Sequence, residues 1–283
     1  MGAAAKALIA ASLVPTLALA SGCALKPTSK APIRPAAQQG DPGIDGEGPQ
    51  SRFFSPPFAL ATAEDAVVRI VGPSGTCTGT VIEDDLVLTA HHCVVERTKG
   101  GGFSSTLVDA GKLRIELGGD YLAWGEVKPR AIVAPPCGER GGGGDIAVLV
   151  LSRKLVGLPT MTPRLDKAPR IGEVIDPVGF GRCSTSSGGI LRRSREGGSI
   201  RAMSGETMML EASVCPGDSG GPVIVRGSHE VVGVVSLSAM DHDERTKAPS
   251  VMARVDAYRS VFANARMIAD GASPSELPPL SCE

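Results

Sequence analysis

Three short segments of the chain carry side chains that together can perform nucleophilic catalysis. Residues 89–93 (TAHHC) supply histidine, residues 145–149 (DIAVL) supply an aspartate, and residues 217–222 (GDSGGP) supply a serine between glycines. A serine hydroxyl is a weak nucleophile at neutral pH unless an imidazole accepts its proton, and the imidazole works best when a carboxylate fixes its tautomer. The order His, Asp, Ser therefore predicts a hydrolase that attacks carbonyl carbons through a serine.

The glycine-bracketed serine also fits a second arrangement, the nucleophile elbow of α/β-hydrolases. An elbow needs a helix directly after the serine, with its acid and histidine later in the chain. Here residues 222–225 (PVIV) predict a strand, and only His229 and His242 remain downstream. A plain polar turn is the other alternative, and it leaves the histidine and aspartate segments unexplained. The order of the residues favours the His, Asp, Ser arrangement.

The composition indicates the elements that must position these residues. The chain has 283 residues with 36 glycines and 22 prolines, and this composition suits many short strands joined by turns. Apolar runs at 67–71, 146–151 and 231–235 and alternation at 113–117 predict strands, and helical spacing within 255–269 predicts a C-terminal helix. Aromatic residues make up 3%, so the core must consist mainly of Val, Ile, Leu and Ala. The formal net charge of −1 gives no electrostatic argument for a nucleic-acid partner.

Seven segments, in this order, resemble the trypsin-like (chymotrypsin-family) serine proteases over roughly residues 63–260. The resemblance implies an all-β fold of two packed antiparallel six-stranded β-barrels, chymotrypsin-like, with a C-terminal α-helix. It also implies protein or peptide substrates and no cofactor. Metal binding by the cysteines is not expected, since no C-x-x-C or H-E-x-x-H spacing occurs. Each segment is short, and their order and spacing carry the resemblance. They are 77–82, 88–93, 145–149, 178–181, 217–222, 235–238 and 249–255.

The resemblance assigns catalytic roles to three residues. His92 stands next to the cysteine and takes the place of the general base, whereas His91 takes an alanine position and is expected to be a neighbour only. Ser219 is the expected nucleophile. Asp145 is the carboxylate expected to orient His92.

Further residues around the serine take supporting roles in the resemblance. The backbone N–H groups of Gly217 and Ser219 are expected to form the oxyanion hole. Ser236 matches the serine that hydrogen-bonds the catalytic aspartate. Asp218 matches the residue that pairs with the amino group freed by zymogen cleavage. Residues 70–72 (IVG) look like such a freed terminus, but they lie in the strand predicted before Cys77, so the partner of Asp218 is left open.

Three serines decide the expected substrate preference. Ser213 stands where relatives that cut after Lys or Arg have an aspartate, and Ser238 and Ser250 stand where wide pockets have glycine. The resemblance therefore implies a narrow pocket for small or medium uncharged side chains. Acidic residues within 241–244 could still reach this pocket, or they could form a solvated turn.

Seven cysteines would leave one unpaired in an oxidising compartment. A lipid on Cys23 would leave six, which can all form disulfides. Six cysteines allow 15 connectivities. The resemblance pairs Cys77 with Cys93. It also gives Cys215 its usual place before the nucleophile, with Cys183 as the candidate partner nearby. The remaining hypothesis joins Cys137 to Cys282.

The N-terminal region differs from the rest of the chain. Residues 1–22 contain an apolar stretch too short to span a membrane and predict a signal peptide. Ordinary cleavage after 18–20 (ALA) competes with a bacterial lipobox that would place a lipid on Cys23, and the odd cysteine count favours the lipid. Residues 23–62 are rich in Pro, Gly and small polar residues and predict a disordered tether. We therefore expect an exported cell-envelope lipoprotein or a secreted protein.

The predicted domain spans residues 63–283, with barrel one at 63–165, barrel two at 166–255 and the helix at 256–270. A monomer that touches the membrane only through the lipid is expected. Two other functions remain open on the same scaffold: a catalytically silent binding module and an esterase.

Overall fold

The computed structural model describes residues 62–119, 123–136, 142–183, 189–239 and 246–281. The expected signal peptide, Cys23 and nearly all of the predicted tether lie outside this part of the chain. So do Cys137, Cys282 and the acidic residues of 241–244.

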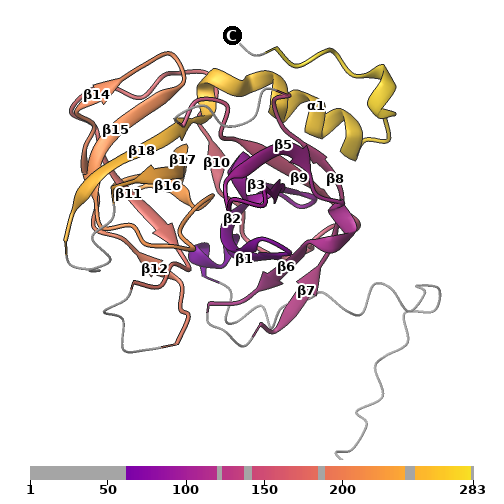
Figure 1. The fold of residues 1–283 in the computed structure, drawn as a ribbon, viewed down its shortest axis with the longest axis horizontal. Helices are drawn as coiled ribbons and strands as arrows, with labels where there is room; N and C mark the ends of the chain where they lie inside the picture. Colours follow the sequence, from indigo (N-terminus) through magenta and orange to yellow (C-terminus); the bar gives the residue numbers. More distant parts are fainter. Residues whose placement is uncertain (1–61, 120–122, 137–141, 184–188, 240–245, 282–283) are drawn as a thin grey trace, which may run out of the picture. The chain divides into compact units, whose positions relative to one another are not determined.

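The described residues form mainly β-strands, which gather in two large sheets (Figure 1). The first sheet has seven strands in the order β7-β6-β1-β2-β3-β9-β8, and every pair in it is antiparallel. Its strands are β1 Val67–Gly72, β2 Gly75–Glu83, β3 Leu86–Thr89, β6 Arg114–Leu117, β7 Gly125–Val127, β8 Pro129–Val133 and β9 Ala147–Leu151.

The second sheet has nine strands, seven of them along the path β12-β11-β16-β17-β18-β15-β14, while β10 pairs with β17 and β13 with β11. Four of the nine are only two residues long. They are β10 Thr162–Pro163, β12 Arg193–Ser194, β13 Gly198–Ser199 and β14 Ala202–Met203. The longer ones are β11 Val174–Gly179, β15 Thr207–Ala212, β16 Pro222–Val225, β17 Glu230–Ser238 and β18 Ala248–Arg254.

The all-β prediction with a C-terminal helix is confirmed, with two differences in detail. The sheets contain seven and nine strands among the described residues instead of six each, and four of the nine are pairings of only two residues. One of these short strands, β10, pairs with β17 in a parallel orientation, whereas the prediction had only antiparallel strands. A separate hairpin is formed by β4 Val95–Arg97 and β5 Phe103–Leu107.

The core consists of aliphatic side chains, as the low aromatic content predicts. All five residues of β9 are buried, which explains why its sequence is continuously apolar instead of alternating. Valine, leucine and isoleucine make up most of the larger core cluster, and Phe180 is among its few aromatic members. This core holds the loops at the strand ends, where the candidate catalytic residues lie.

Helix α1 Arg259–Ala269 follows the short 3-10 turn η6 Val255–Tyr258 and packs against β8 and β9 of the first sheet (Figure 1). Its buried face carries Val261, Phe262, Ala265 and Ile268, the spacing of an amphipathic helix. None of the helices formed by the described residues has the length and apolar character needed to cross a membrane.

Arg266 ties α1 to the first sheet. Its guanidinium donates to Glu83 at 2.7 Å and to Asp85 at 2.8 Å, and Asp85 is nearly buried. The hydrogen bond from Arg266 holds the pKa of the Asp85 carboxyl below its ordinary value, against the effect of burial. The C-terminal helix is therefore fixed to the β2–β3 turn at its polar edge as well as through its apolar face.

Candidate active site

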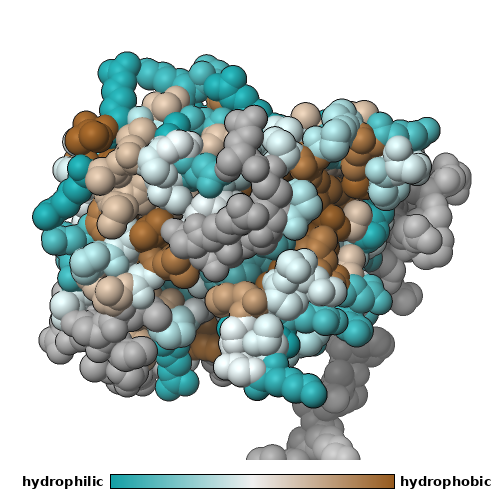
Figure 2. All heavy atoms as spheres, turned by 45° about the horizontal axis from the view of Figure 1, so that its top comes forward, coloured by the Kyte–Doolittle hydropathy of each residue, from teal (hydrophilic) through white to brown (hydrophobic). Residues whose placement is uncertain are grey.

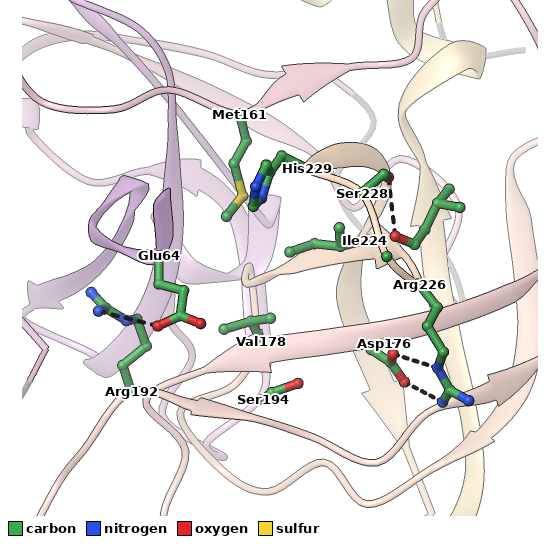
Figure 3. A pocket seen from close by; sticks show the side chains of 12 residues that line it. Glu64, Met161, Asp176, Val178, Arg192, Ser194, Ile224, Arg226, Ser228 and His229 are labelled. Atoms are coloured by element: carbon green, nitrogen blue, oxygen red, sulfur yellow. Dashed lines mark hydrogen bonds and ion pairs between the residues drawn. The ribbon is translucent and has the colours of Figure 1, made fainter. Parts of the chain in front are cut away.

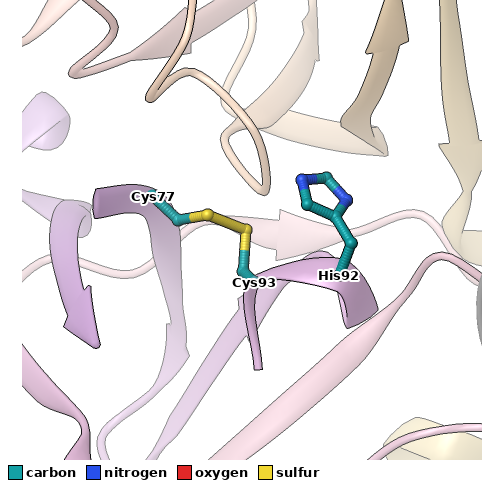
Figure 4. A group of neighbouring side chains, drawn as sticks. All are labelled: Cys77, His92 and Cys93. Atoms are coloured by element: carbon teal, nitrogen blue, oxygen red, sulfur yellow. A yellow bond between two sulfur atoms is a disulfide. The ribbon is translucent and has the colours of Figure 1, made fainter. Parts of the chain in front are cut away.

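The segment expected to carry the general base forms a 3-10 turn, η4 His91–Cys93, directly after β3. A disulfide joins Cys93 to Cys77 on β2 and closes a loop with a sequence separation of 16. A loop of that size contributes about 3 kcal/mol in the chain-entropy model. Figure 4 shows the His92 imidazole projecting from the turn beside this disulfide. Nitrogen and sulfur atoms of these three residues lie within 4.8 Å of one another, but sulfurs joined to each other are not thiolate ligands for a metal.

Asp145 lies directly before β9, fully buried, and its two oxygens are both occupied. One oxygen accepts a hydrogen bond from the His92 backbone N–H at 2.9 Å. The other lies 2.8 Å from Nδ1 of the His92 ring and accepts a hydrogen bond from the Ser236 hydroxyl at 2.5 Å. The structure thus brings together Asp145, His92 and Ser236, the contacts that the sequence motifs led us to expect.

The environment of Asp145 keeps its carboxyl ionised. Burial acts to raise the pKa, but the hydrogen bonds from His92 and Ser236 and the charge interaction with His92 outweigh it, so the pKa lies below its ordinary value of 3.8. An ionised carboxylate at Nδ1 favours the tautomer that carries its proton there. The other ring nitrogen, Nε2, is then free to accept a proton from a hydroxyl.

Ser219 lies in the turn before β16, next to the segment that carries His92. Its carbonyl oxygen accepts a hydrogen bond from the Thr78 N–H at 2.8 Å and lies 3.6 Å from the Cys93 sulfur. The hydrogen bonds among the described residues do not include one from the Ser219 hydroxyl to the His92 ring. Such bonds are often long without substrate and tighten when it binds.

The glycines around Ser219 have a geometric reason. Gly217 has φ +101° and Gly220 has φ +79°, a backbone region that side chains rarely adopt. The Gly217 carbonyl accepts a hydrogen bond from the Thr78 hydroxyl at 2.7 Å, which fixes the orientation of this turn. Neither the Gly217 N–H nor the Ser219 N–H donates to a protein acceptor within the described residues. Both donors are therefore available to a substrate oxygen.

Asp218 has a partner that the sequence did not reveal, Arg195. The Arg195 Nε lies 2.7 Å from one Asp218 oxygen, Asp218 is fully buried, and only 4% of the Arg195 surface is exposed. The Asp218 oxygens also accept hydrogen bonds from the Gly181 N–H at 2.7 Å and the Cys215 N–H at 2.8 Å. Burial raises the pKa of the Asp218 carboxyl, and Arg195 and the two N–H donors oppose that rise.

Nothing local in the sequence singles out Arg195 among 29 lysines and arginines. It follows the two-residue strand β12 and reaches the serine turn only through the fold. A second disulfide, between Cys183 and Cys215, joins the segment after β11 to the segment that carries Asp218 and Ser219. The ion pair and the disulfide together hold the turn that carries Ser219.

Two of the three serines expected in the specificity pocket contact each other. Ser238 and Ser250 face each other across β17 and β18, and their hydroxyl oxygens lie 2.8 Å apart. Ser250 also donates to the Ala248 carbonyl at 2.9 Å. Ser213 is buried, and its hydroxyl instead accepts a hydrogen bond from the Glu196 N–H at 3.1 Å.

A cavity of about 230 Å³ lies away from these residues (Figure 3). Its apolar wall comes from Met161, Val178 and Ile224, and Arg226 on its rim forms an ion pair with Asp176 at 2.7 Å. None of the residues that line it belongs to the candidate catalytic group. The chemistry expected from the sequence is therefore located in the turns at the strand ends and not in this cavity.

Comparisons with known proteins agree with this geometry. A model of the trypsin family matches residues 61–262. Among similar solved structures, neuropsin, a serine protease expressed in the limbic system of mouse brain, is 16% identical with a TM-score of 0.53. The scabies mite inactivated protease paralogue S-I1 is 18% identical with a TM-score of 0.53.

Each of these two matches covers 72% of this chain and 95% of the other. At such low identity the two structures show a shared chymotrypsin-like fold and nothing about activity. The family match spans most of the described residues, including all three segments that carry the histidine, the aspartate and the serine. By that match, the chain belongs to the trypsin family.

Proposed function

We propose that this protein is a serine endopeptidase that hydrolyses peptide bonds through an acyl-enzyme. The observation that carries the proposal is the buried Asp145 carboxylate, which contacts the His92 backbone, the His92 ring and the Ser236 hydroxyl at once. A buried carboxylate with three polar contacts that converge on a histidine orients that imidazole for proton transfer.

In the proposed mechanism, His92 Nε2 accepts the Ser219 hydroxyl proton while the serine oxygen attacks the substrate carbonyl carbon. The negative charge that develops on the carbonyl oxygen is stabilised by the N–H groups of Gly217 and Ser219, where the loss of one donor typically costs about 10²- to 10³-fold in rate. His92 then gives its proton to the leaving amine. A water molecule, activated by the same imidazole, releases the acyl group and restores Ser219.

The proposed substrates carry a small or medium uncharged side chain before the scissile bond. Ser213 supplies no anion for Lys or Arg, and the hydrogen-bonded hydroxyls of Ser238 and Ser250 occupy space that glycines would leave open. Cationic side chains would therefore lose their water without gaining a charged partner.

The Arg195–Asp218 ion pair supports a protease that needs no activating cleavage. Asp218 already has a buried cation and two N–H donors, so a freed amino terminus is not required to neutralise it. We propose that Arg195 holds the turn of Gly217 and Ser219 in its working conformation in the uncut chain.

Export of the protein remains part of the proposal. Disulfides persist in oxidising compartments, and the two formed by the described cysteines agree with an exported domain. We propose cleavage of residues 1–22, a lipid on Cys23 and a tether to about residue 62. The N-terminal residue and mass of the mature protein test this, since an unmodified N-terminus at Ser21 contradicts the lipid anchor.

A catalytically silent binding module is the second candidate. The hydrogen bond from Ser219 to His92 is not present among the described residues, and one similar structure is that of an inactivated protease paralogue. Residues 92, 145 and 219 nevertheless keep the types that catalysis needs. An esterase is a third candidate, because the same groups can cleave activated esters.

Labelling with an active-site-directed fluorophosphonate tests the proposed function. We expect the full chain, produced in an oxidising compartment, to be labelled at Ser219 and to cleave a peptide library. The Ser219→Ala variant is the matched control and should show neither reaction. A wild-type protein that binds peptides without labelling or cleavage supports the silent module, and labelling with ester cleavage only supports the esterase.

A further inference from the structure

The β4–β5 hairpin follows His92 directly and pairs with no other strand among the described residues. Its turn is closed by two backbone hydrogen bonds, from Thr98 N–H to the Gly102 carbonyl at 2.8 Å and from Gly101 N–H to the Thr98 carbonyl at 2.9 Å. Most of its side chains are exposed. The hairpin therefore adds little to the core, although it lies next to the candidate active site.

Phe103, the first residue of β5, contacts the ring of the candidate general base. The two ring centroids lie 4.8 Å apart and the planes are tilted by 52°, which is a favourable aromatic arrangement. The Arg97 guanidinium lies 4.0 Å from the centroid of the same phenyl ring, and Arg97 also donates to the Gly101 carbonyl. Two contacts therefore fix the Phe103 ring in place beside His92.

The Phe103 side chain is nevertheless far from buried, because 37% of the residue remains exposed. Large exposed apolar residues are scattered over the described surface, and Figure 2 shows apolar residues in several separate patches on one face. Phe103 differs from the other exposed apolar residues in its contact with His92. An exposed aromatic ring held in a fixed orientation beside a catalytic imidazole is suited to contact a substrate.

We propose that Phe103 is a substrate-positioning residue that forms the wall of a subsite for an apolar side chain next to the scissile bond. This inference rests on the proposed function. A carbonyl attacked by Ser219 must lie within reach of His92 Nε2, so an adjoining substrate residue passes the edge of that imidazole. There it meets the exposed Phe103 ring. An apolar side chain would cover this ring, whereas a lysine or arginine would face the nearby Arg97 cation.

A purely structural role for Phe103 makes a different prediction. If the ring only supports His92, its removal should lower the rate for every peptide by the same factor. If it forms a subsite wall, its removal should lower the rate mainly for peptides with an apolar residue beside the scissile bond. The ratio of kcat/KM values for two peptides separates these roles, because a general loss of active enzyme cancels in the ratio.

The test uses the full chain and fluorogenic peptides with the same residue in the serine pocket. In these peptides the residue directly before the scissile bond is kept constant. Leu, Phe, Gly or Lys is placed either one residue further toward the N-terminus or directly after the scissile bond. We expect wild type to prefer Leu or Phe over Gly and Lys at one of these two positions. Phe103→Ala should reduce that preference about tenfold, the scale of a lost apolar contact in a specificity pocket. Phe103→Leu should retain most of it. Thr106→Ala, an exposed change on the same strand, is the matched control and should leave the preference unchanged.

Each outcome supports or overturns the inference. Equal loss on all peptides, or an unchanged preference in Phe103→Ala, refutes the subsite wall while the fluorophosphonate label on Ser219 still supports the protease. A wild-type protein that is labelled but shows no preference at either position also refutes it. If wild type is neither labelled nor active, the proposed function fails and the inference fails with it.

Discussion

Replacing Arg195 with methionine removes the cation that faces the buried Asp218 carboxylate and keeps most of the side-chain volume. Removal of one partner from a buried ion pair typically costs about 3–5 kcal/mol, because the other charge stays buried without its partner. Asp218 keeps two backbone N–H donors, from Gly181 and Cys215, so we expect a cost of about 3 kcal/mol. Domains typically have about 5–15 kcal/mol of stability, so the variant should still fold.

The folded Arg195→Met variant should also be less active than wild type. Asp218 stands between Gly217 and Ser219, and a displaced carboxylate would disturb both oxyanion donors. A lost oxyanion donor typically costs about 10²- to 10³-fold in rate, and we expect a fall in kcat/KM of that order. Urea unfolding and the rate of fluorophosphonate labelling measure the two effects separately.

The defect should depend on pH in a defined direction. Burial already raises the pKa of Asp218, and without Arg195 the carboxyl should bind a proton at still higher pH. A carboxyl whose pKa is raised in the folded state stabilises the fold most below its unfolded pKa, and this contribution is lost as pH rises through the folded pKa. The stability deficit of Arg195→Met should therefore shrink as the pH is lowered from neutral. In the Asp218→Asn background no carboxyl titrates at this position, so adding Arg195→Met there should change the stability by an amount that does not depend on pH.

Arg201→Met is the matched control for this experiment. Arg201 forms an ion pair with Glu211 at 2.9 Å, but both side chains are largely exposed, and such pairs are worth about 0.2–1 kcal/mol. If Arg195→Met unfolds at the same urea concentration as Arg201→Met and is labelled at the wild-type rate, the role given to Arg195 is wrong. A wild-type chain that requires proteolytic cleavage before any labelling would refute it as well.

Three further predictions concern the candidate catalytic residues and the pocket. Asp145→Asn should lower kcat by about 10⁴, the loss seen when such an aspartate loses its charge, and peptide cleavage that stays near the wild-type rate would contradict its role. His92→Ala should abolish labelling and His91→Ala should keep most of it, as measured by the label bound per molecule; the reverse result would exchange their roles. Cleavage after Ala, Val and Leu should exceed cleavage after Phe and Arg in otherwise identical peptides, and a strong preference for Arg would contradict the pocket assigned to Ser213, Ser238 and Ser250.

The sequence was informative where a function depends on a short segment. The types and order of His92, Asp145 and Ser219 led to the family, and the structure brings Asp145 into contact with both His92 and Ser236. The family could be predicted because each of these segments needs particular residues at neighbouring positions. Gly217, for example, was expected to turn its N–H toward the substrate, and its φ of +101° in the structure is one that glycine adopts readily.

The sequence was less informative where a role depends on residues far apart in the chain. Phe103 reaches His92 because a hairpin folds back, and neither its position nor its type sets it apart from the other five phenylalanines in the sequence. The count of strands in the second sheet also differed from the prediction, because pairings of two residues carry almost no pattern. Periodicity needs several residues to become visible, and β10, β12, β13 and β14 have two each.

Gly179 and Gly181 belong to a short sequence motif, but their role depends on a residue far along the chain. Their motif was one of the seven that indicated the family, but the sequence did not show what the glycines make room for. A Cβ atom at either position would collide with the Asp218 carboxyl, and the Gly181 N–H donates to that same carboxyl. The glycines are therefore required by a buried acid that lies 37 residues further along the chain from Gly181. A buried carboxylate needs compensating charge or hydrogen-bond donors, and the fold supplies Arg195 and two N–H groups that the motif alone does not show.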